Sequence, residues 1–352
     1  MKFSKVIIAL AAAAWGVPAA ASSAQAAAWG VPAAASSATA AEAGAPPRHA
    51  AERELGREAV TVGFYNVENL YDTIPSPFYD DSDYTPRGRN RWDSERYRTK
   101  RDNLCRVADA MALDILGLAE VENEAVVRDI VAGAATDYCY IHRTSGDSRG
   151  MDLALLYKGD RFIPRSVRQL ESGFSRQFLY VCGELCGRRV DIILCHLPSR
   201  LNDEALRGRV IAKLHAAVDS LVRNDPRACP VVMGDFNAEP RERIMRNRFG
   251  TGRRGPGGAL LFSAMEEARR AGRGSYLYRG RWYMYDNIFL SWRLAAGPEF
   301  RSRGGEVFVR EWMIASGKEA AAGGTPLRSF RAERYEGGFS DHLPVFCVLE
   351  LW

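Results

Sequence analysis

Four short stretches, far apart in the chain, each place a carboxylate, amide or imidazole side chain at the end of an apolar run. They are Phe64-Tyr65-Asn66, Gly117-Leu118-Ala119-Glu120, residues 232–237 (Val-Met-Gly-Asp-Phe-Asn) and residues 338–344 (Gly-Phe-Ser-Asp-His-Leu-Pro). Apolar runs of this kind are typical of buried strands that deliver side chains to one edge of a sheet. Oxygen and imidazole groups gathered there hold a hard divalent cation and activate water against a phosphate. The four stretches therefore predict metal-assisted phosphoester hydrolysis.

Within the third stretch, Asp235 and Asn237 are two residues apart. Side chains alternate along a strand, so these two point to the same side, about 7 Å apart, while Phe236 faces the core. An Asp-x-Asn sequence binds a metal, orients a water or caps the next helix, but a cap explains only one of the two residues. We expect Gly234 to let the backbone approach a ligand closely. The pair is therefore predicted to be catalytic.

The other stretches contribute charged groups that need partners. In an extended chain, Asp341 and His342 point to opposite sides and therefore contact different groups. Glu120 ends a buried strand, where a lone charge is costly unless a cation or hydrogen bonds compensate it. Asn66 begins the sequence Asn66-Val67-Glu68-Asn69, which taken alone predicts a turn.

These ordered motifs, between about residues 59 and 352, resemble the endonuclease/exonuclease/phosphatase superfamily of Mg-dependent phosphoesterases. The closest likeness is to predicted extracellular nucleases of bacteria. The resemblance implies an α/β fold, a four-layered α/β sandwich of two packed mixed sheets flanked by helices. It also implies that Glu120 and Asp341 bind Mg2+ or Mn2+, that Asn66 lies near the metal, and that His342 contacts the scissile phosphate.

Two more stretches complete the resemblance. His196 follows a strand, where related nucleases carry a histidine, although Leu197 stands where they often have Trp. Asp152 resembles the group that orients this histidine, and Asp286 matches the carboxylate that orients the last one. The expected mechanism has Asp235 orienting or deprotonating the attacking water. The candidate catalytic residues are His342, Asp235, Asn237, Asp286, His196 and Asp152; the candidate metal ligands are Glu120, Asp341 and Asn66. His49, His142 and His215 are expected to be structural.

Periodicity predicts the elements that position these residues. Alternating or continuous apolar runs favour strands, and apolar residues at helical spacing favour helices. Ser94 is the expected N-cap of the first helix. Strands are expected at 59–66, 115–119, 138–142, 153–157, 178–185, 190–195, 230–234, 286–291 and 345–351, and helices at 94–111, 123–131 and 203–223. Spacing alone indicates only an α/β protein.

The N-terminal segment indicates export. Lys2 and Lys5 precede an apolar run that small residues follow, as in a signal peptide. Residues 12–24 and 26–38 repeat one sequence, so cleavage is expected near residue 26 or 40. Residues 41–58 are predicted to be a linker, and no cysteine precedes Cys105 to carry a lipid anchor. We therefore expect a secreted or periplasmic monomer without a membrane anchor or an obligate protein partner.

The substrate is less sharply indicated. The formal net charge of +5 does not by itself argue for nucleic acid, but residues 241–310 contain fifteen Arg, no Lys and six acids. Such a basic flank attracts a polyanion. A low-specificity nuclease acting on DNA or RNA is the main expectation. The alternatives are a phosphoesterase for lipid head groups, inositol phosphates or nucleotides, and a binding module without catalysis. Residues offered for nucleic-acid contact are Tyr84, Trp92, Tyr97, Arg200, Arg246, Arg253, Arg254, Tyr278 and Trp282.

The seven cysteines are expected to be mainly buried thiols. Cys182 and Cys186 are expected on one strand, too far apart to pair with each other.

Overall fold

The computed structural model describes residues 58–246, 248–249, 261–315 and 324–352. The predicted signal peptide (1–40) and all but the last residue of the predicted linker (41–58) lie outside these ranges. Residues 250–258 of the Arg-rich segment, with Arg253 and Arg254, lie outside them too. Within the described ranges, no helix has the length and apolar character needed to span a membrane.

The first of two six-stranded sheets contains both ends of the described chain. Its order is β13-β18-β1-β2-β4-β3, and only β1 and β2 run parallel to each other. The strands are β1 (Ala59–Leu70), β2 (Ile115–Val121), β3 (Tyr138–Arg143), β4 (Asp152–Lys158), β13 (Phe300–Val307) and β18 (Val345–Leu351). Strand β13 lacks a clear apolar alternation, and it was not expected.

The second sheet has the order β5-β6-β7-β8-β12-β9, with β7 and β8 parallel. Its strands are β5 (Phe162–Leu170), β6 (Phe178–Leu185), β7 (Arg188–His196), β8 (Pro230–Asp235), β9 (Leu261–Ser263) and β12 (Asp286–Ser291). Cys186 and Gly187 both have positive φ (49° and 74°) and form the tight turn expected between β6 and β7. Strand β5 is half exposed and was not predicted, because its apolar residues are sparse.

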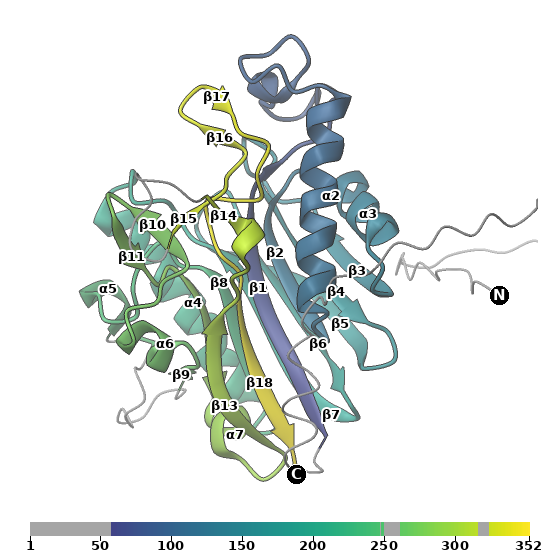
Figure 1. Cartoon of the computed structure of the whole chain (residues 1–352). Helices are drawn as coiled ribbons and strands as arrows, with labels where there is room; N and C mark the ends of the chain where they lie inside the picture. Colours follow the sequence, from purple (N-terminus) through teal and green to yellow (C-terminus); the bar gives the residue numbers. More distant parts are fainter. Residues whose placement is uncertain (1–57, 247, 250–260, 316–323) are drawn as a thin grey trace, which may run out of the picture. The chain divides into compact units, whose positions relative to one another are not determined.

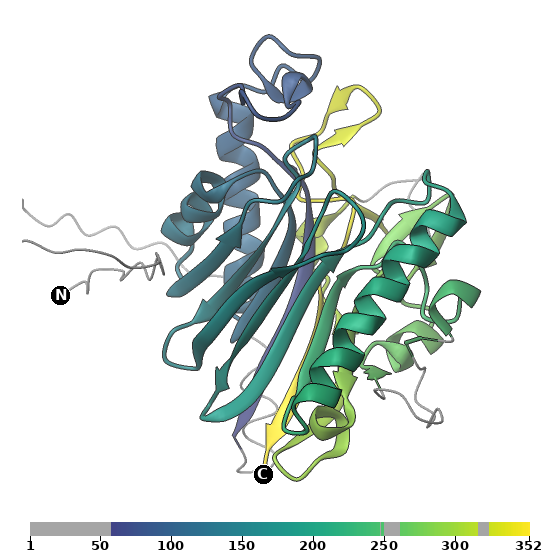
Figure 2. The same ribbon diagram turned by 180° about the vertical axis from the view of Figure 1, so that it is seen from behind.

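Three helices cover the outer faces of the sheets. The helices α2 (Ser94–Met111) and α3 (Glu124–Gly133) lie against the first sheet, and α4 (Glu204–Asn224) lies against the second (Figures 1 and 2). The two sheets pack face to face between them, which confirms the four-layered sandwich. The side chain of Asp93, not of Ser94, caps α2 by accepting from the N–H groups of Glu95 and Arg96.

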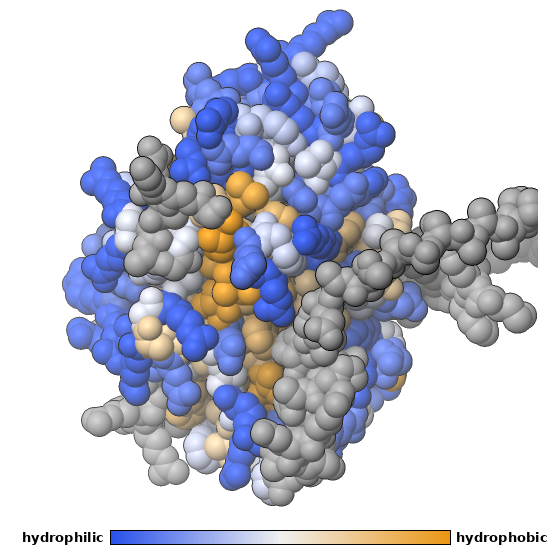
Figure 3. All heavy atoms as spheres, viewed as in Figure 1, coloured by the Kyte–Doolittle hydropathy of each residue, from blue (hydrophilic) through white to orange (hydrophobic). Residues whose placement is uncertain are grey.

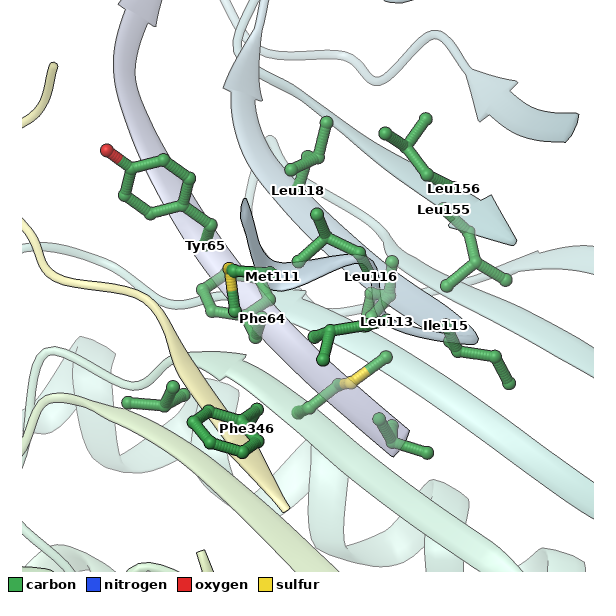
Figure 4. Close-up of a cluster of buried hydrophobic side chains, with 14 of the residues drawn as sticks. Phe64, Tyr65, Met111, Leu113, Ile115, Leu116, Leu118, Leu155, Leu156 and Phe346 are labelled. Atoms are coloured by element: carbon green, nitrogen blue, oxygen red, sulfur yellow. The ribbon is translucent and has the colours of Figure 1, made fainter. Parts of the chain in front are cut away.

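The core between α2 and the first sheet is built from the apolar runs that the sequence marked as strands. Figure 4 shows Tyr65, Leu116 and Leu118 of the parallel strands β1 and β2. Beside them lie Met111, the last residue of α2, and Leu113, which follows that helix. All five side chains are at most 3 % exposed. On the outside, the face drawn in Figure 3 is mostly hydrophilic, with one hydrophobic strip over β18 and the region of β14 (Ile314–Ala315).

Shorter elements and loops sit around the sandwich. A loop at residues 72–93 and the hairpin β16–β17 project from the same end of the molecule (Figure 1), and Phe330 of the hairpin contacts Tyr84 of the loop. The short elements are η1 (Ser82–Tyr84), α5 (Arg243–Arg246), α6 (Glu266–Arg270), β10 (Tyr276–Tyr278), β11 (Arg281–Tyr283), α7 (Trp292–Ala296), η2 (Glu311–Met313), β14 (Ile314–Ala315), β15 (Thr325–Pro326), β16 (Phe330–Arg331) and β17 (Arg334–Tyr335).

The seven cysteines are free thiols in this structure. Cys105, Cys195, Cys229 and Cys347 are buried, and the other three are partly buried. Cys182 lies on β6, whereas Cys186 lies in the turn that follows it.

Candidate active site

Three of the predicted residues lie side by side at one edge of the second sheet. Asp235, the last residue of β8, pairs in register with His196 of β7 on one side and with Asp286 of β12 on the other. The strands approach closely at Gly234, where an added Cβ would lie 1.9 Å from the carbonyl oxygen of Cys195. Gly234 therefore allows β7 and β8 to lie close together. The sequence predicted that this glycine admits a ligand, but it is the backbone of β7 that lies against it.

The first sheet brings its residues to the same edge through two irregularities. The register of β1 and β2 shifts after Asn66 and after Ala119. Glu68, Asn69 and Glu120 take positive φ angles of 52°, 53° and 66°. Such angles cost on the order of 1 kcal/mol or more in a non-glycine residue and cluster at functional sites. The bulges let β1 run to Leu70 rather than end at residue 66 as predicted.

Asn66 links the carboxylates of the two sheets. Its side-chain N–H group donates to Oε1 of Glu120 (3.1 Å) and to Oδ2 of Asp235 (3.2 Å). Its backbone carbonyl accepts a hydrogen bond from the hydroxyl of Ser340 (2.7 Å), which precedes Asp341. The four stretches that the sequence singled out therefore meet at one place, as predicted.

Asn237 is closer to Asp235 than an extended strand would place it. It takes a positive φ of 47°, and its backbone N–H donates to Oδ1 of Asp235 (2.8 Å). Its side-chain nitrogen lies 3.2 Å from the other Asp235 oxygen and 3.1 Å from the carbonyl of Leu197. The expected separation of about 7 Å is thus wrong, because the chain turns back after β8. In this arrangement Asn237 orients the carboxylate of Asp235.

His342 is held as a cation. Its Nδ1 lies 2.6 Å from Oδ2 of Asp286, as predicted, and its Nε2 lies 3.9 Å from Oδ2 of Asp235. Burial alone lowers the pKa of this imidazole, but the charges of Asp286, Asp235 and Asp341 outweigh burial and raise the pKa well above 6.5. Protonated His342 can therefore donate a hydrogen bond or a proton to an oxygen in the site.

For Asp235, unlike His342, burial has a larger effect on the pKa than the neighbouring charges. Burial raises its pKa to about 7, with the charge of His342 lowering it and that of Asp286 raising it. The side chain is only 2 % exposed. A carboxylate that changes charge near neutral pH is suited to take a proton from water, because general bases work best with a pKa close to the working pH.

The predicted partnership of Asp152 with His196 is wrong. Oδ2 of Asp152 lies 2.9 Å from Nε2 of His142, and Oδ1 accepts from the backbone N–H of Ser145. The reason is topological: β4 begins at Asp152 and pairs with β3, which carries His142, whereas His196 belongs to the second sheet. Asp152 and His142 therefore form a structural pair. His215 bonds Asp219 within α4, as a structural histidine.

His196 instead contacts Arg176, which sequence reasoning missed. Nη1 of this arginine lies 2.8 Å from both ring nitrogens of His196, and Nε lies 3.5 Å from Oδ2 of Asp147. Burial first, and then the charge of Arg176, lower the pKa of His196 well below 6.5. His196 is therefore neutral where His342 is charged. Arg176 lies two residues before β6, and nothing in its sequence context distinguishes it from other arginines.

A second cluster fixes Asp341. Its Oδ2 lies 3.0 Å from Nη2 of Arg328, and the same guanidinium lies 2.7 Å from Oε1 of Glu68. Nζ of Lys100, only 1 % exposed, donates to the hydroxyl of Ser329 (2.8 Å) and to the carbonyl of Phe339. Glu68 was read as part of a turn, but it is buried and connects β1 with the segment that carries Asp341.

The carboxylates at this edge suit a divalent cation. Glu120 is partly buried and accepts hydrogen bonds from the neutral N–H groups of Asn66 and Asn69, and the nearby His196, at 3.6 Å, is neutral as well. Asp235, by contrast, faces the cationic His342 at 3.9 Å. A partly buried carboxylate without a cationic partner, such as Glu120, favours a cation with oxygen ligands. Asp235, Asp286 and His342 also lie close enough together to hold a metal. However, the 2.6 Å hydrogen bond between Asp286 and His342 already explains their proximity.

Comparisons with known proteins address the family and the fold. The model of the endonuclease/exonuclease/phosphatase family matches residues 61–351. No curated protein matches the chain in sequence.

Several solved structures share the fold at low sequence identity. A humanized form of D. rerio TDP2 has a TM-score of 0.54 and 16% identity, covering 83% of this chain and 98% of that one. The mannosyl-6-phosphatase of Bacteroides thetaiotaomicron has a TM-score of 0.54 and 17% identity, covering 82% and 99%. The catalytic domain of human Nocturnin has a TM-score of 0.54 and 17% identity, covering 88% and 100%. The family model decides the assignment: this chain belongs to the endonuclease/exonuclease/phosphatase family of divalent-metal-dependent phosphoester hydrolases.

Proposed function

We propose that this chain is an exported nuclease that hydrolyses phosphodiester bonds of DNA or RNA with little sequence preference and uses Mg2+ or Mn2+. The observation that carries the proposal is a row of aromatic rings beside the catalytic histidine. The ring of Tyr276 lies 4.7 Å from that of His342, followed by Tyr285 at 5.4 Å and Tyr283 at a further 5.1 Å.

Arginines accompany this row. The guanidinium of Arg200 lies 5.6 Å from the ring centre of Tyr285, and that of Arg281 lies 4.9 Å from the ring centre of Tyr283. Tyr276 and Tyr283 are half-buried and Arg281 is exposed, so both ends of the row reach solvent, whereas Tyr285 is buried between them and only supports the other two rings. Aromatic rings interleaved with cations bind single strands, because bases stack on the rings while the cations attract the phosphates.

The aromatic residues chosen from the sequence only partly meet this role. Trp92 is fully buried in the core and cannot stack on a base. Tyr97 is tied to Asp129 by a 2.7 Å hydrogen bond, while Tyr278 is 48% exposed and Trp282 is half-buried. The proposed platform is therefore made mainly of tyrosines that the sequence did not single out.

The residues of the site divide the work of phosphodiester hydrolysis. Asp235, oriented by Asn237, accepts the proton of the attacking water. His342, held by Asp286, donates to the phosphate oxygens that gain charge, and neutral His196 supplies a further hydrogen-bond donor. Hydrogen-bond donors held in fixed positions stabilise this charge without having to reorganise.

We propose that the metal is held mainly by Glu120 and Asp341, with Asn66 orienting Glu120. A divalent cation bound there would withdraw charge from a nonbridging phosphate oxygen. Arg328 also contacts the carboxylate of Asp341, and this ion pair keeps the proposed metal ligand oriented.

The proposal is tested with purified protein, supercoiled plasmid and total RNA in Mg2+, Mn2+ or EDTA. We expect nicking that stops in EDTA, that falls with added salt, and that drops by at least about 100-fold in His342→Ala. His215→Ala, on the outer helix, is the matched control and should keep full activity. Intact nucleic acid together with hydrolysis of a phospholipid or an inositol phosphate would contradict the nuclease proposal and support the alternative substrates.

A further inference from the structure

A cleft of about 520 Å³ opens beside the catalytic edge, between the loop at 72–93 and the hairpin β16–β17. It shares Glu68, Asn69 and Arg328 with the site. Asn69 lines the cleft and donates its backbone N–H to Oε2 of Glu120 (2.9 Å). Arg328 lines it as well and holds Asp341. A cation held by Glu120 and Asp341, as proposed above, would bind the scissile phosphate, and one substituent of that phosphate would then reach the mouth of this cleft.

The wall of the cleft combines three kinds of chemical group. Tyr84 and Phe330 supply aromatic surface, and Tyr84 is held in place by stacking on Tyr71, with the ring centres 4.3 Å apart. Asp80 and Asp83 are exposed carboxylates on the loop.

Arg149 is an exposed cation of the same wall. The hydroxyl of Tyr71 donates a hydrogen bond to the backbone carbonyl of Arg149 (2.7 Å), so Arg149 is fixed beside the aromatic part of the wall.

This combination selects among the possible occupants. A sugar phosphate has hydroxyl groups for the carboxylates and an anion for the arginines, but it has no flat face for the rings. A nucleotide offers all three: a planar base, donor groups on base and sugar, and a phosphate.

We infer that this cleft binds one nucleotide unit of the substrate, on one side of the scissile phosphate, and this inference rests on the proposed nuclease function. The base lies against Tyr84 and Phe330, with its donor groups facing Asp80 and Asp83. The phosphate next to it lies at Arg149. Because carboxylates only accept hydrogen bonds, bases that carry amino groups are favoured over thymine, which adds a base preference to an otherwise unspecific nuclease.

The test compares diesters that share one leaving group. The 5′-p-nitrophenyl esters of guanosine and thymidine monophosphate carry a nucleoside, whereas bis(p-nitrophenyl) phosphate carries none. The measured quantity is kcat/KM for each nucleotide ester divided by that for bis(p-nitrophenyl) phosphate. In the wild type we expect this ratio to exceed ten for guanosine and to be smaller for thymidine.

Variants then assign the preference to the cleft. Asp83→Asn should lower the guanosine ratio about tenfold and leave the thymidine ratio less affected, and Arg149→Met should lower both about tenfold. The matched controls are Asp160→Asn, in the turn at the far end of β4, and Arg143→Met, an exposed residue of β3. Both controls should keep the wild-type ratios.

Each outcome has a distinct meaning. Hydrolysis of all diesters with ratios unchanged in Asp83→Asn and Arg149→Met overturns the cleft inference and leaves the nuclease proposal standing. Hydrolysis of glucose 6-phosphate that depends on the same two residues overturns the assignment to nucleotides. If no diester is hydrolysed, the proposed function fails, and calorimetry with guanosine monophosphate decides the cleft by itself. Binding weakened about tenfold by both variants supports the cleft, and no binding to the wild type overturns it.

Discussion

The Nδ1 atom of His342 lies 2.6 Å from Oδ2 of Asp286, and this contact joins the two sheets of the sandwich. Asp286 begins β12 in the second sheet, whereas His342 precedes β18 in the first. Both side chains are buried, so the carboxylate acts on the imidazole with little screening by water. The site therefore exists only when both sheets are packed together.

This pair predicts the pH dependence of hydrolysis. Activity should rise with pH as Asp235, with a pKa of about 7, loses its proton, and it should fall at high pH when His342 loses its own. Since the charge of Asp286 raises the pKa of His342, Asp286→Asn should move the alkaline limb of the kcat/KM profile to lower pH. The acidic limb should also move down, because Asp286 raises the pKa of Asp235. An unchanged profile would contradict these charge assignments.

Arg176 predicts the charge state of the second histidine. Removing its guanidinium in Arg176→Met should raise the pKa of His196, because burial then remains as the main cause of the depression. Titration of the ring protons by NMR measures this shift, and kcat should fall about tenfold or more. Arg165→Met, at an exposed arginine of β5, is the control and should leave the titration of His196 unchanged.

The affinity for a metal ion distinguishes two possible sets of ligands. One set is Glu120 with Asp341, and the other is Asp235, Asp286 and His342. If Glu120 is the main ligand, Glu120→Gln should weaken the binding of Mn2+ by more than about tenfold in calorimetry. Asp286→Asn should change this affinity much less. The reverse order of effects would place the metal at Asp235, Asp286 and His342 instead.

Lys100 predicts a link between stability and catalysis. Lys100→Met removes the buried cation beside Glu68, leaves the more exposed Arg328 as its remaining cation and releases the carbonyl of Phe339, so we expect a loss of about 3 kcal/mol in the free energy of unfolding. A fall in kcat of the folded protein should accompany this loss, because Asp341 follows Phe339 by two residues. Loss of stability with an unchanged kcat would limit Lys100 to a structural role.

The pH dependence of stability gives a second measure of Lys100. Burial lowers its pKa to about 8 from 10.5, so the unfolded chain binds more protons between these two pH values. The stability that Lys100 contributes therefore increases as pH rises from 8 to 10.5. The difference in unfolding free energy between wild type and Lys100→Met should grow over this range, and a constant difference would contradict the assignment.

The close packing at Gly234 leaves no room for a side chain between β7 and β8. Gly234→Ala places a methyl group 1.9 Å from the backbone of Cys195, so β7 and β8 must separate, at a cost of about 3 kcal/mol. Gly208→Ala is the control, because its nearest neighbour lies 4.0 Å away and alanine favours the helix. Thermal unfolding should show a lower Tm for the first variant and an equal or higher Tm for the second.

Local patterns in the sequence were sufficient for most of the fold. Buried strands such as β8 and β12 are continuous apolar runs, and α4 has a regular apolar face, so each was predicted within a residue or two. The family resemblance added the order of the layers. Strands β5 and β13 were missed because half-exposed strands carry little apolar alternation.

For the site, the sequence determined which residue types would meet: Asn66, Glu120 and Asp235 end apolar runs and His342 precedes one, so these runs deliver all four residues to one edge. The tertiary structure alone decided which groups pair. Asp152 bonds His142 and not His196, because strand order set the neighbours, and Arg176 and Lys100 enter the site from segments without a local signal. A local pattern reports burial and direction along one element, whereas the protonation state of each histidine depends on charges that only packing brings within a few ångströms.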